Sequence, residues 1–201
     1  FDIEIEMGGR LTEHYVYTAP KPVTSIAWYY PNPFTKKDQW FILILDKKKQ
    51  LKVTKKDGNK VIFPCDSEET LLELFIRFMQ TSQPDALVGF NSDFFDIPYL
   101  YHRIRNVLGE EEARKLSPIG VVKYKKPDNP YWSHRDMYVD IAGVESLDYM
   151  RLHKKYSWKD EPSYKLEAIG EKYAGIGKID YEGTLDTLFR DDIDKFIDYN
   201  F

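Results

Sequence analysis

The sequence has little of three features that would each indicate a class of protein. Its 201 residues include a single cysteine, Cys65, so it cannot form an internal disulfide or a thiolate metal site. No apolar stretch approaches the roughly 20 residues of a membrane span, and no signal-peptide pattern is visible. It also lacks a positive net charge, since 29 Lys and Arg stand against 33 Asp and Glu, a balance of −4. The first two absences favour a cytoplasmic protein that is neither secreted nor embedded in a membrane.

Positive charge is concentrated locally, in two groups of lysines. One group lies between residues 47 and 56 and the other between residues 123 and 126. A protein of negative net charge that binds nucleic acid would have to attract phosphates through such patches. The alternative is that these lysines protect the exposed edges of hairpins, because lysine commonly occupies that position.

The first strand that the sequence predicts carries two acids on one face. Side chains alternate along a strand, so Asp2 and Glu4 project together while Ile3 and Ile5 point into a core. Carboxylates one strand repeat apart repel each other, and a hard divalent cation relieves that repulsion. Taken alone, so short a pattern is better explained as a solvated strand face.

The order of the remaining elements predicts a mixed α/β fold. Apolar runs and turn residues indicate an antiparallel first part, followed by strand, helix, strand, turn and helix, which is typical of a mixed sheet flanked by helices. The expected elements are an irregular loop at 10–22, strands at 23–30, 40–45, 61–63 and 86–90, a charged hairpin at 47–60, and helices at 67–82, 96–108, 110–116, 143–156, 164–173 and from about 191.

Asp96 occupies the point where a predicted strand hands over to a helix. The turn Asn91-Ser92-Asp93 precedes it, and α/β proteins build their sites at this end of a sheet. An aspartate that merely caps the helix is the alternative interpretation.

A long hairpin is expected over residues 119–141. Its tip carries the pair Tyr131-Trp132, which could stack on nucleic-acid bases. Packing of the tip against a neighbouring domain explains the pair equally well.

Three stretches resemble the exonuclease motifs of family B DNA polymerases of the T-even bacteriophage type. They are Phe1-Asp2-Ile3-Glu4, Asn91-Ser92-Asp93-Phe94-Phe95-Asp96 and Tyr199-Asn200-Phe201. Further similarity runs through 146–156, 161–166 and 177–183, so the resemblance covers essentially the whole chain. Each motif alone is weak, but their order, spacing and flanking residues together are specific.

The resemblance implies a fold, a reaction and a setting. The fold would be ribonuclease H-like, a mixed five-stranded sheet flanked by helices with an extended β-hairpin insertion at about 119–141. Residues 1–201 would be the exonuclease domain of a longer polymerase chain. The reaction would be proofreading, the 3′-to-5′ hydrolysis of single-stranded DNA with two ions of Mg²⁺ or Mn²⁺. Expected partners are primer–template DNA, the polymerase domain of the same chain and a sliding clamp, in the cytoplasm of a bacterial or phage-infected cell.

The resemblance also assigns the catalytic residues. Asp2, Glu4 and Asp96 match the metal-ligand carboxylates, and Tyr199 matches the tyrosine that orients the attacking water. Lys178 matches the lysine that steadies the scissile phosphate. Such chemistry is reasonable, because metal ions activate water and a lysine offsets charge that develops on phosphate oxygens.

Two further residues match positions that hold the unpaired 3′-terminal nucleotides, Asn91 and Phe95. An aromatic ring stacks on a base without reading its identity, as proofreading requires. The hairpin tip at Tyr131 and Trp132 is expected to help separate the primer end from its template.

The third motif departs from the family pattern. The family pattern places an aspartate at the second position beyond Phe201, which this sequence does not include, and Asp194 and Asp198 are poor substitutes for it. On a helix, Asp198 would point about a hundred degrees away from Tyr199. Two other functions therefore stay open: a non-catalytic module that binds single-stranded DNA or serves as a scaffold, and an exoribonuclease with related motifs.

Overall fold

The structure, a computed structural model, describes residues 1–6, 11–31, 38–52, 54–56, 58–125, 138–158, 160–175, 177, 179 and 181–201. Within this part the chain is a mixed α/β protein, as predicted. None of the helices in the described residues is both long and apolar enough to cross a membrane.

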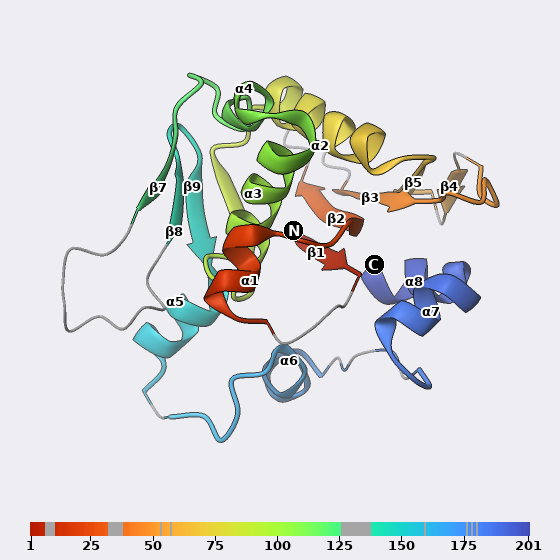
Figure 1. Cartoon of the computed structure of the whole chain (residues 1–201). Helices are drawn as coiled ribbons and strands as arrows, with labels where there is room; N and C mark the ends of the chain where they lie inside the picture. The colour runs from red at the N-terminus through yellow and green to blue at the C-terminus, as the bar shows by residue number, and fades with distance from the viewer. Residues whose placement is uncertain are drawn as a thin grey trace.

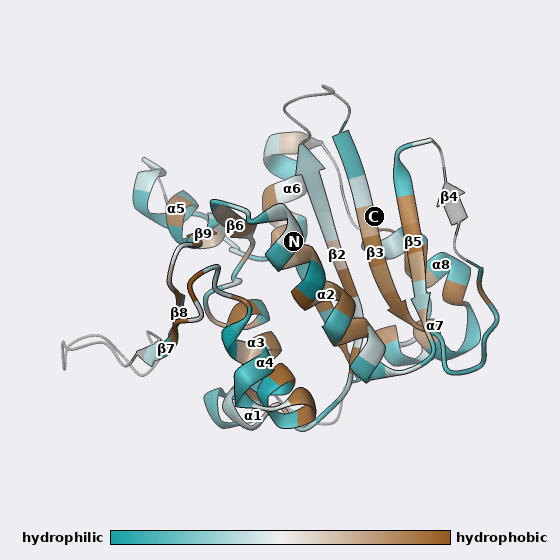
Figure 2. Cartoon of the chain, turned by 90° about the horizontal axis from the view of Figure 1, so that it is seen from above, coloured by the Kyte–Doolittle hydropathy of each residue, from teal (hydrophilic) through white to brown (hydrophobic). Residues whose placement is uncertain are grey.

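The largest sheet has five strands in the order β1-β2-β3-β5-β4. All neighbours in it are antiparallel except β3 and β5, which are parallel. Figure 2 shows β2, β3 and β5 side by side, with apolar residues concentrated in β3 and β5. The strands are β1 (Asp2–Ile5), β2 (Val23–Pro31), β3 (Asp38–Leu45), β4 (Thr54–Lys56) and β5 (Lys60–Cys65).

Four further strands form two small sheets. The strand β6 (Ala86–Gly89) pairs in parallel with β9 (Glu145–Asp148), and β7 (Val122–Lys125) pairs antiparallel with β8 (Tyr138–Ile141). The backbone nitrogen of Phe1 donates a hydrogen bond of 2.6 Å to the carbonyl of Val88 in β6. This bond brings β6 to the free edge of β1, so the first strand lies between β2 and the β6–β9 pair.

Helices cover both faces of the large sheet. Figure 1 shows α2 on one side of β3 and β5, with α7 and α8 on the other side. The helices are α1 (Glu13–Thr18), α2 (Glu68–Ser82), α3 (Asp96–Leu108), α4 (Glu110–Arg114), α5 (Tyr149–Tyr156), α6 (Leu166–Ala174), α7 (Leu185–Asp191) and α8 (Ile193–Asn200).

Alternation along the strands divides the interior into two cores. On β3, Leu43 and Leu45 join the core under α2 and α3, while Ile42 and Ile44 join the core under α7 and α8. The prediction that this strand is buried on both faces is confirmed for its second half, where the four side chains of 42–45 are all buried. The two cores fix α3 and α8 on opposite sides of β1, and the site is built from these elements.

Two predictions of secondary structure are wrong because tertiary or very local contacts decide them. The predicted loop at 10–22 contains α1, which begins where the Thr12 hydroxyl accepts a hydrogen bond from the Tyr15 nitrogen. Six residues are too few to show a helical period. The predicted helix at 143–156 begins instead with the strand β9, because its pairing with β6, nearly sixty residues away, outweighs local propensity.

Two helices near the end of the chain also differ from the prediction. The sequence predicts that Ser163 caps a helix at 164–173, whereas α6 begins after Lys165 without a side-chain cap. The helix α7 is not predicted by the sequence pattern, although Thr184 and Thr187 form a reciprocal capping box at its start. Its seven residues follow a short polar stretch, so the apolar pattern is too brief to indicate it.

His102 on α3 predicts how stability will depend on pH. Its side chain is fully buried among Tyr17, Tyr101 and Tyr124, and neither ring nitrogen has a hydrogen-bond partner among the described residues. Burial, with a smaller contribution from Arg105, lowers its pKa from 6.5 to about 4. The unfolded chain therefore binds the proton more tightly, so the neutral ring contributes stability above pH 6.5 that is lost as the pH falls towards 4.

We expect His102→Phe to remove this loss. Phenylalanine keeps the ring packing, so unfolding in urea at pH 7 and pH 4.5 should show the variant losing about 2 kcal/mol less than the parent on acidification. His14→Gln, at an exposed position on α1, is the control for replacing a histidine and should lose as much stability as the parent. Equal acid sensitivity of the parent and His102→Phe would contradict the prediction.

Candidate active site

The site begins where β1 passes the first residue of α3. The backbone nitrogen of Ile3 donates a hydrogen bond of 3.0 Å to Oδ1 of Asp96, which is 2% exposed. The helix cap is Phe95, and it makes no side-chain capping bond. Asp96 is therefore no helix cap, and its carboxylate is directed at β1 instead.

Asp96 and Asp2 interact electrostatically. Burial, followed by the negative charge of Asp2, raises the pKa of Asp96 well above its usual range. Asp2 itself is exposed and paired with Ala27 of β2, on the face that α8 covers. Two carboxylates in this arrangement favour an added positive charge, and their oxygen atoms are the ligands that hard divalent cations prefer.

The end of α8 lies over the same face of β1. Glu4 is paired with Ser25 of β2, whose hydroxyl makes a 2.9 Å hydrogen bond to Oδ1 of Asn200. The preceding residue, Tyr199, packs at the margin of the α7–α8 core, with its ring edge-on to Tyr181 at 5.3 Å. The two ends of the described chain thus meet at this point, as Figure 1 shows by the positions of N and C.

A cleft of about 580 Å³ opens between β1, β2, α6 and α8. Three acids line it, Asp2, Glu167 and Asp198, and among its described lining residues there is no Lys, Arg or His. Tyr199 also lines it. A phosphodiester is anionic, so a cleft of this charge accepts one only with bound cations.

Aromatic rings form another part of the cleft wall, and sequence reasoning missed them. Phe90 enters from the end of β6, and the rings of Tyr29 and Trp40 lie 4.9 Å apart on β2 and β3. Tyr29 is 42% exposed. The runs of aromatic residues at 28–30 and 40–41 were the available signal, but only the strand register shows that Tyr29 and Trp40 share a wall.

The turn between β6 and α3 holds the two predicted nucleotide-binding residues. Asn91 has a left-handed φ of +64°, and a Cβ added to Gly89 would lie 2.6 Å from that of Ser92. Phe95 is half-buried and packs on Tyr99 at 5.6 Å. Neither Asn91 nor Phe95 lines the cleft.

Comparison with known protein families shows which family the chain belongs to. Residues 1–169 match the model described as DNA polymerase family B, exonuclease domain. The chain belongs to this family. The exonuclease domain is 35% identical over 173 residues to the DNA-directed DNA polymerase of Escherichia phage RB69, covering 84% of the chain and 19% of that protein.

Two other relatives are also much longer than the part of them that the exonuclease domain matches. The DNA-directed DNA polymerase of Enterobacteria phage T4 is 35% identical over 143 residues, covering 71% of the exonuclease domain and 16% of the relative. DNA polymerase 1 of Sulfolobus acidocaldarius is 32% identical over 152 residues, which cover 73% of the exonuclease domain and 15% of that polymerase. The chain thus spans less than a fifth of each of these relatives.

The structure describes only some of the predicted site residues of the exonuclease domain. Lys178, Tyr131 and Trp132 are outside the described residues. The helical period predicts that Asp198 points away from Tyr199, yet both line the cleft, because a wide cleft contacts more than one side of α8. Within the described ranges, no three His, Cys, Asp or Glu side chains are grouped closely enough to hold a metal ion.

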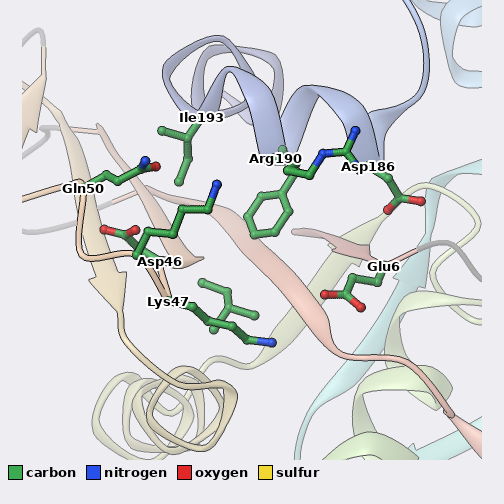
Figure 3. Close-up of a pocket in the computed structure, with 10 residues that line it drawn as sticks. Glu6, Asp46, Lys47, Gln50, Asp186, Arg190 and Ile193 are labelled. Carbon is green, nitrogen blue, oxygen red and sulfur yellow. The ribbon is translucent and has the colours of Figure 1, made fainter.

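A second cavity of about 330 Å³ lies between the end of β3 and α7. Figure 3 shows Asp186 and Arg190 entering it from α7, with Asp46 and Lys47 opposite. The oppositely charged side chains balance each other here, and none of the predicted catalytic residues that the structure describes lines this cavity.

Proposed function

We propose that the chain is the 3′-to-5′ proofreading exonuclease domain of a longer DNA polymerase and hydrolyses the ends of single-stranded DNA. The observation that carries the proposal is the pair Asp2 and Asp96, placed beside a cleft that Tyr199 lines and that has no cationic side chain among its described residues. Such a site suits an anionic substrate bound through metal ions. Primer–template DNA, the parent polymerase domain and a sliding clamp are the partners that the family suggests, in a cytoplasmic setting.

The carboxylates would hold two ions of Mg²⁺ or Mn²⁺. Asp2, Glu4 and Asp96 supply hard oxygen donors, and an aspartate beyond Phe201 would complete the set. When bound, the ions supply an activated water and offset charge on the leaving 3′ oxygen. The fixed bond from Ile3 to Asp96 holds one donor in place before any ion arrives. This site and the mixed sheet with helices on both faces are the basis for proposing a ribonuclease H-like fold.

Substrate positioning is divided among several elements. Asn91 and Phe95 at the turn before α3 would hold the terminal nucleotides, and Lys178 would steady the scissile phosphate. Exposed Tyr29 offers a ring on which a base can stack. The hairpin tip at Tyr131 and Trp132 would separate the primer end from its template.

The test is a degradation assay. The chain, and a polypeptide extended beyond residue 201, are incubated with 5′-labelled single-stranded DNA and Mg²⁺ or Mn²⁺. Shortening from the 3′ end that a chelator and Asp2→Ala abolish would support the proposal. Full activity of the Asp2→Ala protein would refute the assignment of the site.

Tyr199→Phe tests the role of the hydroxyl group. Phenylalanine keeps the packing but removes the group that would orient the attacking water, so we expect turnover to fall about 100-fold with DNA binding unchanged. The control is Tyr181→Phe, whose ring packs edge-on against Tyr199. Equal turnover of the two variants would show that the Tyr199 hydroxyl has no part in the reaction.

A non-catalytic DNA-binding module is the second candidate, because the described residues contain no group of three metal ligands. It predicts salt-sensitive binding of single-stranded DNA without turnover, even for the extended polypeptide. An exoribonuclease is distinguished in the same assay by supplying RNA and DNA ends side by side.

A further inference from the structure

A buried carboxylate outside the predicted site holds the turn before α3. Asp148 ends β9 and is 3% exposed. Its Oδ1 accepts a hydrogen bond from the backbone nitrogen of Asn91 at 2.9 Å, and its Oδ2 accepts one from that of Asp93 at 3.3 Å. These donors lie 57 and 55 residues away in the sequence, so the contact joins two separate parts of the fold.

The same carboxylate also caps α5. Oδ1 accepts from the backbone nitrogens of Met150 at 2.9 Å and Arg151 at 3.3 Å. Four backbone donors therefore converge on one side chain. A helix cap needs only the two local ones, which a serine hydroxyl satisfies as well. The two distant bonds require the longer carboxylate of Asp148.

A second carboxylate strengthens the connection. Asp93, within the turn, accepts a hydrogen bond from the hydroxyl of Ser146 on β9 and pairs with Arg151 at 2.7 Å. Its side chain is 17% exposed, against 49% for Arg151. The positive charge of Arg151 offsets the two neighbouring carboxylates.

The turn needs such support because its backbone is unusual. Asn91 adopts a left-handed φ of +64°, a conformation that residues with a side chain adopt less readily than glycine, although asparagine tolerates it better than most. The backbone at Gly89, just before the turn, is also tightly packed, since a Cβ added there would lie 3.1 Å from the Phe1 carbonyl oxygen. Gly89 and Asp148 are paired across the β6–β9 sheet, so the support reaches the turn directly.

We propose that Asp148, supported by Arg151, is a positioning residue of the exonuclease site: it fixes the turn that presents Asn91 and Phe95 to the DNA. This inference rests on the proposed function. Asp96 has its own anchor in the Ile3 nitrogen. Loss of Asp148 should therefore disturb the holding of nucleotides more than the holding of metal ions.

The experiment compares variants of the extended polypeptide on single-stranded DNA with Mg²⁺. Asp148→Ser keeps the α5 cap but cannot span to the turn, so kcat/KM should fall about 100-fold, mainly through KM. Asp148→Asn retains an oxygen at the Oδ1 position and should recover most of this loss. Thr12→Ala, which removes the cap of α1 and does not line the cleft, is the control for lost stability and should leave KM unchanged.

Arg151→Ala provides a test that does not depend on a buried residue. It should raise KM a few-fold, whereas Lys154→Ala, exposed and one turn further along α5, removes the same charge and should not. An unchanged KM in Asp148→Ser would overturn the inference. If Asp148→Ser does not fold, an unchanged KM in Arg151→Ala overturns it. Absence of turnover in the parent protein would instead refute the proposed function.

Discussion

Asp96→Asn is expected to lower exonuclease turnover by at least about 1,000-fold while the protein stays folded and becomes more stable. The amide oxygen can still accept the hydrogen bond from Ile3, so the local geometry is retained. What is lost is a negative charge that would hold a metal ion, a contribution of several kcal/mol to the transition state. What is gained is relief from burying that charge beside Asp2. Each kcal/mol regained should raise the melting temperature by roughly 2–4 °C.

This prediction is checked by turnover on 5′-labelled single-stranded DNA and by thermal unfolding of the same preparations without divalent cations, because bound ions would stabilise the parent protein. Asp194→Asn, an equal charge change at an exposed position on α8, is the control and should alter neither quantity. Loss of activity together with gain of stability is the signature of a functional carboxylate, because a structural one would stabilise the fold when present. Undiminished turnover in Asp96→Asn would exclude Asp96 from the reaction.

The parts of the site that the sequence predicted are those set by short-range rules. Ile3 is buried and Asp2 exposed because side chains alternate along a strand. Asp96 could be placed at a strand-to-helix junction because the turn residues before it mark the boundary. The N-cap of α2 was predicted correctly for the same reason, since Ser67 accepts from the nitrogen of Thr70.

The parts that could not be predicted depend on pairings between distant segments. The sequence pattern places Asp148 within a helix, and its role at the turn is visible only once β9 is paired with β6. The aromatic wall of the cleft depends on the register of β2 with β3, which places Tyr29 opposite Trp40. Local sequence carries little information about such contacts, because the same residues are compatible with several registers.

The cleft is a further feature that depends on contacts between distant segments. Its walls come from β1, β2, α6 and α8. A long-range hydrogen bond from Ser25 to Asn200 holds the end of α8 against β2, beside β1. A sequence comparison could place Tyr199 in a motif, but its meeting with Asp2 follows from the packing of the second core. The sequence therefore identified most of the chemistry, while the fold determines which groups meet.

Glu68→Gln is expected to destabilise the protein strongly, because it breaks a buried ion pair. Glu68 begins α2 and is 8% exposed. Its two oxygens accept from Nε and Nη2 of Arg103 on α3 at 2.8 and 2.7 Å, and Oε1 also accepts from the backbone nitrogen of Val23 at 2.8 Å. Arg103 in turn donates to the carbonyl of Ala19 at 3.1 Å. One ion pair thus joins α2 and α3 to β2 and to the end of α1.

Removing the negative charge leaves Arg103 largely buried and uncompensated, with a side chain only 15% exposed. Breaking a buried pair in this way costs about 3–5 kcal/mol, whereas replacing both partners by apolar groups often costs little. We therefore expect Glu68→Gln to lower the melting temperature by roughly 10 °C.

The double variant Glu68→Gln/Arg103→Met should regain much of that loss. Glu69→Gln, the exposed neighbour in the same helical turn, is the control. Equal stability of the Glu68 and Glu69 variants in urea would show that the ion pair does not hold these elements together.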